Sequence, residues 1–249
     1  EQGQASAQNN LGGCYSKGFG VEQDVSEALK WYRKSAEQND EAAQYNIGYM
    51  YYHGKGLPQS NEKAVEWFRK SAEQNYANAL NDLGSCYSDG LGVEKDVYTA
   101  VSYYRKAVEL GYAPAQCNLG ICYEFGEGVK KDFRQAAKLY QDAANQGHAK
   151  AQYYLGVCYD EGEGVKRNHK EAVAWYRKAA DQGYVAALVN LGSCYYKGKG
   201  VSRDYGEAVK LYRKAALQGN AIAQYNLGIC YEYGDGVPRD REEANRWYK

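Results

Sequence analysis

The sequence predicts an all-α fold, an α-solenoid of seven antiparallel helix pairs, from three observations. The first is a fixed period of 36 residues, marked by Leu-Gly or Ile-Gly pairs that begin at Leu11, Ile47, Leu83, Leu119, Leu155, Leu191 and Leu227. The second is a pair of segments in each copy whose apolar residues recur at three- and four-residue intervals, as on a helix. The third is a glycine-containing connector between the two segments. Repeats of this length stack into arrays, because no single copy buries its apolar face alone.

The first helix of each copy is expected to end at the connector. In the first copy Ala7, Leu11 and Tyr15 lie on one face, and we expect Tyr15 and its equivalents to pack in the core. Glycine suits the left-handed backbone conformation that ends a helix, because it has no side chain to clash. All seven copies keep two connector glycines: Gly18 and Gly20, Gly54 and Gly56, Gly90 and Gly92, Gly126 and Gly128, Gly162 and Gly164, Gly198 and Gly200, Gly234 and Gly236.

The second helix begins at a capping residue. Asp24 with Glu27 predicts a capping box, in which the first side chain accepts from an exposed amide and the second reaches back. The pairs Asp132 with Gln135, Asn168 with Glu171, Asp204 with Glu207 and Asp240 with Glu243 repeat it, whereas Ser60 and Asp96 cap alone. Tyr32 and its equivalents are expected in the core. The helix should end near residues that tolerate a left-handed turn, Asn39, Asn75, Gly111, Gly147, Gly183 and Gly219.

The copies are predicted to form one repeat domain over residues 1–249, because no linker or shift in composition divides the chain. Their expected bounds are 5–40, 41–76, 77–112, 113–148, 149–184, 185–220 and 221–249, with residues 1–4 as the tail of a preceding copy. Glu1 aligns with Glu37, and Lys249 aligns with Arg33 partway through a copy. The sequence therefore reads as an excerpt of a longer protein.

Residues 223–240, Ala-Gln-Tyr-Asn-Leu-Gly-Ile-Cys-Tyr-Glu-Tyr-Gly-Asp-Gly-Val-Pro-Arg-Asp, resemble the Sel1-like repeat family, which is related to the tetratricopeptide repeat. The resemblance covers essentially every residue, since the period, Leu-Gly-x-x-Tyr, Gly-x-Gly-Val, the Asp cap, the Trp-Tyr pair and the Ala-Ala close occur in order. It implies a right-handed superhelix whose first helices line the concave side. Family members mostly act as adaptors that gather protein complexes, although a fold alone does not define a task.

Composition argues against several classes of function. Lys plus Arg equals Asp plus Glu at 31 each, and no polybasic run would attract nucleic acid or an anionic membrane. No apolar run approaches the roughly 18 residues of a membrane span. The three histidines occupy three different repeat positions and Cys-x-x-Cys is absent, so neither a metal site nor a catalytic base is predicted. The repeated Gly-x-Gly lacks the Lys-Ser/Thr of a phosphate loop, and no cofactor is expected.

Six of the seven cysteines share one repeat position, Cys14, Cys86, Cys122, Cys158, Cys194 and Cys230, and Met50 occupies it in the second copy. Stacked helices lie about 8–10 Å apart, beyond the roughly 7 Å that a disulfide spans between Cα atoms. We therefore expect buried thiols without disulfides, which favours a reducing compartment such as the cytoplasm. The secreted branch of the family has a second cysteine in each unit, which this chain lacks. Cys117 is expected on the open face as a candidate reactive thiol.

Positions that vary between copies predict the binding face. Residues aligned with Asn9, Gly13, Ser16 and Lys17 fall on one helical face and are called positions 9, 13, 16 and 17 below. Aromatic and acidic candidates for binding at or beside these positions are Tyr45, Tyr49, Tyr52, Phe125, Tyr153, Tyr154, Asp160, Glu161, Tyr196, Tyr225 and Tyr233. Such a face suits a peptide with apolar anchors and basic residues.

An asparagine column adds further candidates: Asn10, Asn46, Asn118, Asn190 and Asn226, with Asp82 and Tyr154 in the remaining copies. An amide offers both a donor and an acceptor, so this column could pair with the backbone of an extended ligand. Tetratricopeptide relatives hold peptides with a similarly placed asparagine. Alternatively, the amides join adjacent helices through local hydrogen bonds. Both interpretations stay open at the level of sequence.

The predicted function is a noncatalytic adaptor that binds a protein or extended peptide along its first-helix face. Two alternatives compete with it. Ser60-Asn61-Glu62-Lys63 matches the Ser-x-x-Lys of penicillin-recognising hydrolases, a chemistry once proposed for the cysteine-rich family branch. Ser60 lies at a capping position, however, and neither Ser-Asp-Asn nor Lys-Thr-Gly follows. The second alternative is a structural rod, in which the terminal repeats stack end to end.

Overall fold

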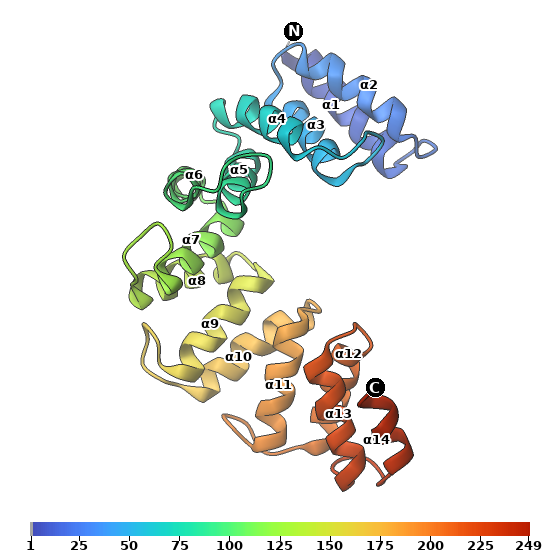
Figure 1. Ribbon diagram of the computed structural model, residues 1–249, viewed down its shortest axis with the longest axis vertical. Helices are drawn as coiled ribbons and strands as arrows, with labels where there is room; N and C mark the ends of the chain where they lie inside the picture. The colour runs from blue at the N-terminus through green and yellow to red at the C-terminus, as the bar shows by residue number, and fades with distance from the viewer. Residues whose placement is uncertain (1) are drawn as a thin grey trace. The chain divides into compact units, whose positions relative to one another are not determined.

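The computed structural model describes residues 2–249 as successive α-helix pairs, without a strand in that range (Figure 1). The helices belong to two compact units, Glu1–Lys131 and Asp132–Lys249. The first unit contains α1 (Gln2–Lys17), α2 (Val25–Ala36), α3 (Glu41–His53), α4 (Asn61–Glu73), α5 (Ala77–Asp89), α6 (Val97–Glu109) and α7 (Ala113–Phe125). The second contains α8 (Phe133–Asn145), α9 (Ala149–Glu161), α10 (His169–Asp181), α11 (Val185–Lys197), α12 (Tyr205–Ala216), α13 (Ala221–Tyr233) and α14 (Arg241–Trp247).

Helix ends follow the predicted signals. Gly54 has φ +66° and ends α3 in the left-handed conformation, and the other connector glycines also have positive φ. Asn39 and Asn75 adopt the same conformation after α2 and α4, with φ of +64° and +60°. At the start of α2 the Asp24 carboxylate accepts from the Glu27 amide at 2.9 Å. The turn and cap predictions are thus confirmed for these residues.

The second half of the capping box is a wrong prediction. The Asp24 N–H donates to the Tyr15 carbonyl at 3.0 Å, so it is not available to Glu27, whose carboxylate instead accepts from Lys30 at 2.7 Å. The same backbone bond recurs from Ser60 to Tyr51, Asp96 to Tyr87, Asn168 to Tyr159, Asp204 to Tyr195 and Asp240 to Tyr231. In these six copies it ties the start of the second helix to the last turn of the first helix. A copy such as that of Ser60 therefore needs no acidic partner three residues later.

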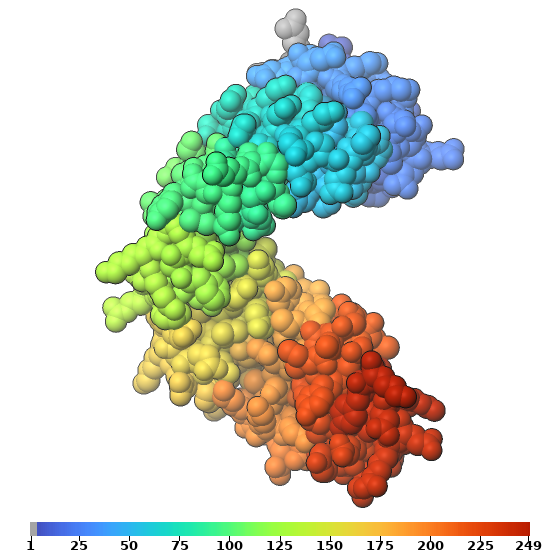
Figure 2. Space-filling view, viewed as in Figure 1, coloured from blue at the N-terminus to red at the C-terminus, as the bar shows by residue number. Residues whose placement is uncertain are grey.

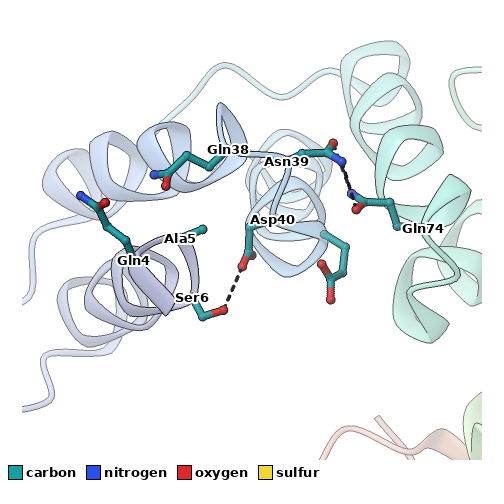
Figure 3. A pocket seen from close by; sticks show the side chains of 8 residues that line it. Gln4, Ala5, Ser6, Gln38, Asn39, Asp40 and Gln74 are labelled. Carbon is teal, nitrogen blue, oxygen red and sulfur yellow. Dashed lines mark hydrogen bonds between the residues drawn. The ribbon is translucent and has the colours of Figure 1, made fainter. Parts of the chain in front are cut away.

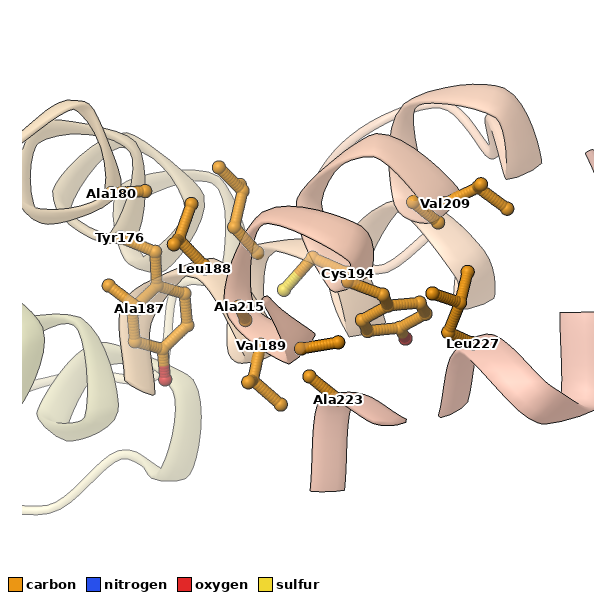
Figure 4. Packing of buried hydrophobic residues seen from close by; sticks show 14 of the residues in the cluster. Tyr176, Ala180, Ala187, Leu188, Val189, Cys194, Val209, Ala215, Ala223 and Leu227 are labelled. Carbon is orange, nitrogen blue, oxygen red and sulfur yellow. The ribbon is translucent and has the colours of Figure 1, made fainter. Parts of the chain in front are cut away.

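The shared Leu-Gly pair builds the core inside each helix pair. Leu83, Leu155 and Leu227 are fully buried. The glycine that follows admits a ring from the second helix: a Cβ at Gly48 would lie 2.7 Å from the Phe68 ring. Successive helices of the second unit converge on one cluster that includes Tyr176, Leu188, Val189, Cys194, Val209 and Leu227 (Figure 4). The prediction that the Tyr32 position is core is confirmed in the interior copies, whereas Tyr248 in the last copy remains 39 % exposed.

The second connector glycine makes the contact between neighbouring copies. A Cβ at Gly92 would overlap the backbone of Asn61, and one at Gly200 would overlap the His169 carbonyl. Both glycines also have positive φ, +72° and +74°, so two separate constraints exclude other residues. In the space-filling view the copies of the first unit follow one another without interruption (Figure 2).

The tyrosines of the Tyr15 position are half-buried, so they belong to the edge of the core. The Tyr87 hydroxyl accepts from Arg69 of the preceding copy at 2.8 Å. Arg177 donates to Tyr195 and Arg213 to Tyr231 in the same way, each at 2.5 Å. This column therefore links adjacent copies through its hydroxyls while its rings pack against helices.

The cysteines of the shared position are small core residues. Cys86, Cys122, Cys194 and Cys230 are buried and form no disulfide within the described residues, as predicted. Burial raises the pKa of Cys86 to about 12 and that of Cys194 to about 11. Because the thiolate is the nucleophilic form, these thiols are poorly reactive. Cys117 is also fully buried, which corrects its predicted place on the open face.

Candidate binding face on the first helices

Position 9 faces the neighbouring copy. Asn81, Cys117 and Val189 are buried there, so the prediction that this column lines an open groove is wrong for them. The physical reason is the orientation of the first helices, which turns position 9 toward the first helix of the next copy. Tyr225 of the last copy keeps 59 % exposure at the same position.

Tyr45, Tyr153 and Tyr154 are half-buried and pack within the chain, so their assignment to ligand binding stays a prediction. The Tyr45 hydroxyl donates to Asp82 at 2.9 Å, and its ring lies 5.6 Å from the Phe68 ring. Burial and the Asp82 carboxylate both raise the pKa of Tyr45. In the second unit the centroid of the Tyr153 ring lies 5.3 Å from that of Tyr184, and Tyr154 stacks on Tyr140 at 5.1 Å.

The asparagine column makes mostly local bonds. Asn46 donates to the Asn9 side chain at 2.8 Å, and Asn118 donates to that of Asn81 at 2.9 Å. Burial raises the pKa of Tyr176, and a hydrogen bond with Asn190 opposes that rise. These contacts favour the second interpretation of the column, in which the amides join neighbouring elements. The two terminal members differ, because Asn10 is exposed and Asn226 borders a pocket.

Position 17 is exposed in every copy, and position 16 is half-buried. Phe125 and Tyr233, both at position 17, expose 60 % and 68 % of their surface and remain candidates together with exposed Glu161. At position 16, Tyr52 packs its ring 5.0 Å from His53. Asp160 is already bonded within the chain, and its role in binding stays a prediction. Its two carboxylate oxygens lie 2.9 Å from His169 Nδ1 and 2.9 Å from Lys199 Nζ.

Two equivalent pockets open on this face, one in each unit. The first pocket, between copies one and two, has a volume of about 540 Å³ and is lined by Ser16, Lys17, Gln23, Val25, Tyr32, Asn46, Tyr49, Met50 and Lys55. The second pocket, between copies six and seven, has about 280 Å³ and is lined by Ser193, Tyr196, Lys197, Tyr212, Asn226 and Ile229. Five lining positions of the two pockets align in the repeat, in the order Ser16, Lys17, Tyr32, Asn46 and Tyr49 with Tyr196, Lys197, Tyr212, Asn226 and Ile229. The pocket is therefore a product of the repeat architecture.

The first pocket contains a candidate binding residue that the sequence did not single out. Lys55 is the middle residue of a Gly-x-Gly connector, a position that we treated only as a turn. Its variation between copies, from Lys55 to Glu127 to Asp235, resembles that of position 17 and is the signal that could have identified it. Tyr49, Tyr196 and Asn226 are predicted site residues that the structure does bring to these pockets.

A third pocket, of about 720 Å³, lies at the opposite ends of the first helices (Figure 3). Its polar groups bond to one another: Ser6 donates to Asp40 at 3.4 Å, and Asn39 donates to Gln74 at 3.2 Å. These bonds stabilise the turns between copies. Because several of its polar groups are engaged in these bonds, we consider it a weaker candidate than the two pockets of the first-helix face.

The Ser60 motif lacks the geometry of a hydrolase. The Ser60 hydroxyl accepts from the Lys63 amide at 3.3 Å as a helix cap and donates to Glu62 at 2.9 Å. The backbone amide of Glu62 and the Ser60 hydroxyl lower the pKa of that exposed carboxylate, which makes it a weak base. The Lys63 ammonium lies over the Tyr51 ring, 5.5 Å from its centroid. No group in this arrangement activates Ser60.

Residues 2–249 were also compared with the requirements of a metal site and of a membrane-spanning helix. Within residues 2–249 no three His, Cys, Asp or Glu side chains gather as a metal site would require. None of the helices there is both long enough and apolar enough to span a bilayer.

The family model of the Sel1 repeat matches residues 5–40, 41–76, 77–112, 113–148, 149–184, 185–220 and 221–249. The chain belongs to the Sel1 repeat family. Its fold is accordingly an all-α solenoid of seven Sel1 repeats, each a helix pair. The tandem match agrees with the 36-residue period and with the resemblance drawn from the motifs.

Solved structures of other Sel1 proteins are similar over nearly the whole chain. A Sel1 repeat protein from Oxalobacter formigenes is 32 % identical, with a TM-score of 0.85 over 96 % of this chain and 94 % of that one. A protective antigen of uropathogenic Escherichia coli is 37 % identical, with a TM-score of 0.82 over 99 % of this chain. This chain spans only 53 % of that antigen's length. A comparison with proteins of curated function returned no similar sequence.

Proposed function

We propose that this Sel1 repeat protein is a noncatalytic adaptor that binds a protein or an extended peptide along the face formed by its first helices. The observation that supports this most directly is the recurrence of one pocket, at equivalent positions in both units, on the face where exposed residues differ between copies. Residues shared by the copies pack the repeats against one another, so exposed residues that vary between copies are available to contact a partner. The Sel1 fold itself is generally a scaffold for protein interaction.

Each pocket can accept one side chain of an extended segment. The wall of each pocket combines a tyrosine ring, an asparagine amide and a third side chain with apolar surface. These are Tyr32, Asn46 and Tyr49 in the first pocket and Tyr212, Asn226 and Ile229 in the second. Exposed aromatic residues at position 17, Phe125 in the first unit and Tyr233 in the second, are suited to anchor such a segment outside the pockets. A few deep side-chain anchors with polar edges are typical of peptide-binding surfaces.

A matched pair of variants tests this proposal. Phe125→Ser with Tyr233→Ser removes two exposed rings from position 17, and Tyr98→Ser with Leu217→Ser removes two side chains of similar exposure elsewhere. In a pull-down from the native source, we expect the first variant to lose most of the proteins that the wild type recovers. The second variant should retain them. Equal recovery by both variants would contradict the assignment of the binding face.

A self-assembling rod is the second candidate, because the last copy exposes an apolar surface. Ile222 and Tyr225 are 63 % and 59 % exposed on α13, and Tyr248 lies beside Tyr225 with ring centroids 5.7 Å apart. In interior copies the equivalent of Tyr225 packs against a neighbour. If the rod is correct, static light scattering should show mass that increases with concentration and falls in Ile222→Ser with Tyr225→Ser. A constant monomer mass would eliminate it.

A further inference from the structure

The first pocket is positively charged and contains no acidic group. Among its nine lining residues, Lys17 and Lys55 are basic and none is Asp or Glu. Neither lysine forms an ion pair within the described residues. The Lys17 and Lys55 ammonium groups lie 5.8 Å and 5.0 Å from the ring centroids of Phe19 and Tyr49. A cation over a ring keeps its N–H donors, so both remain able to bind an anion.

The interior of the first pocket adds neutral donors and an apolar wall. Burial raises the pKa of Tyr32, and a hydrogen bond with Ser16 opposes that rise. One of the two hydroxyls donates in that bond, so the other remains free to donate to a ligand oxygen. Val25, Tyr49 and Met50 supply apolar surface beside them. The pocket thus matches a short apolar stem that ends in a carboxylate.

We propose that the first pocket binds an acidic side chain, Asp or Glu, of an extended peptide. This inference rests on the proposed function, because it names the chemistry of the partner at that same face. The ammonium groups of Lys17 and Lys55 contact the carboxylate at the mouth, and the hydroxyls of Ser16 and Tyr32 lie deeper. Charge-assisted hydrogen bonds of this kind are stronger than neutral ones and favour an acid over its amide.

The second pocket lacks these features and is a control within the same chain. Tyr196 takes the place of Ser16 and fills part of the space, and Asp235 takes the place of Lys55. The Tyr196 hydroxyl donates to Asp235 at 2.5 Å, so the lysine of the first pocket is replaced by a carboxylate already bonded within the chain. Lys197 is the remaining basic residue of the lining. Acid recognition is therefore confined to the first pocket.

The test begins with a random twelve-residue peptide library displayed on phage and selected on the immobilised full chain. Displayed peptides are fused at their C-terminus, so any preference for acid comes from side chains. Selected peptides are then synthesised, and their affinities are measured for the wild type, for Lys17→Gln with Lys55→Gln, and for Lys34→Gln with Lys70→Gln. The last variant has the same change in charge, and its lysines lie on the second helices over Trp31 and Trp67, 4.3 Å from each ring centroid.

We expect the selected peptides to be enriched in Asp or Glu and to bind the pocket variant about fivefold to tenfold more weakly than the control variant. Added salt should reduce that difference. Peptides without acidic enrichment, or equal affinity for the two variants, would overturn this inference and leave the proposed function intact. If the wild type enriches no peptide over an uncoated surface, both are overturned. Thermal melting by circular dichroism verifies that the pocket variant is folded.

Discussion

The first and second pockets have the same framework and different chemistry. Both form where the first helix of one copy meets the next, and Tyr32 and Tyr212 occupy the same place in them. The first is larger and is flanked by two lysines, whereas the second has about half the volume, with Tyr196 bonded to Asp235. Two positions make most of this difference, position 16 and the middle of the Gly-x-Gly connector. The repeat therefore places a pocket at equivalent positions, and under our proposal these two positions determine which ligand it binds.

The largest effect is expected from the second connector glycine of the second and seventh copies. Gly236 has φ +76°, and a Cβ there would overlap the Tyr205 carbonyl, whereas a Cβ on equivalent Gly56 would meet the Val25 side chain at 2.5 Å. Gly236→Ala should lower the free energy of unfolding by about 3 kcal/mol, because the contacted backbone cannot move aside. Gly56→Ala should lower it by about 1–2 kcal/mol, because the contacted atom belongs to a side chain. Gly219→Ala is the control, since its φ of +81° adds strain but nothing lies within 4 Å. Urea unfolding followed by circular dichroism gives the order, and a control as damaging as Gly236→Ala would refute it.

Exchanging the two variable positions should transfer the acid preference. Tyr196→Ser with Asp235→Lys gives the second pocket the residues of the first at both places. We expect this variant to bind acidic peptides selected on the wild type at a second site, with an affinity similar to that of the first pocket. The binding free energy at the second pocket should improve by about 1 kcal/mol relative to the wild-type second pocket. Isothermal titration calorimetry measures the change in stoichiometry. An unchanged single site would show that the pocket chemistry lies elsewhere.

The asparagine column should affect stability more than binding. Asn118→Ala removes the donor that bonds Asn81 at 2.9 Å and leaves a buried acceptor without it, for a cost of about 1–2 kcal/mol. Peptide affinity should be nearly unchanged, because the bond lies between copies. Unfolding and binding measured on the same preparation separate the two roles. A loss of affinity with normal stability would restore the interpretation of the column as a ligand ladder.

The smallest effect concerns Asp82, the acidic member of that column. Burial raises its pKa, even though Asn81 and Tyr45 donate to it. Because the folded pKa lies above the unfolded one, the stability that Asp82 contributes is present at low pH and lost as pH rises through the folded value. Asp82→Asn should therefore stabilise the chain at pH 7 by on the order of 0.5–1 kcal/mol. The gain should shrink toward pH 4, and a gain independent of pH would point to packing instead.

The sequence was sufficient for the fold because the shared residues act locally. Gly54, Asn39 and Asp24 each define one turn or cap, and each could be read without knowledge of its neighbours. The missing half of the capping box depends on a backbone bond from Asp24 to Tyr15, which leaves no trace in residue type. The candidate binding face was harder to predict, because it depends on how one helix pair is rotated against the next. That rotation buries Cys117 and packs half-buried Tyr153 against Tyr184, although their column varies as freely as an exposed one.

The pockets themselves join residues that are far apart in the chain. Ser16 and Lys55 belong to different copies, and only the angle between those copies brings them to one cavity. Asp160 is a second example of a contact between copies that the sequence does not reveal. Its carboxylate pairs with Lys199 of the next copy. Variation between copies predicts the binding face, and contacts between copies show which of its residues are already engaged within the chain.

The most direct test of the central claim is a two-dimensional amide NMR titration of the isotope-labelled chain with an acidic peptide selected on it. If shared residues build the stack and variable ones bind, the shifts should concentrate at Ser16, Lys17, Tyr49 and Lys55. The indole signals of Trp31 and Trp67 on the second helices should remain still. Shifts centred on those indoles, with the first-helix amides unmoved, would contradict the account.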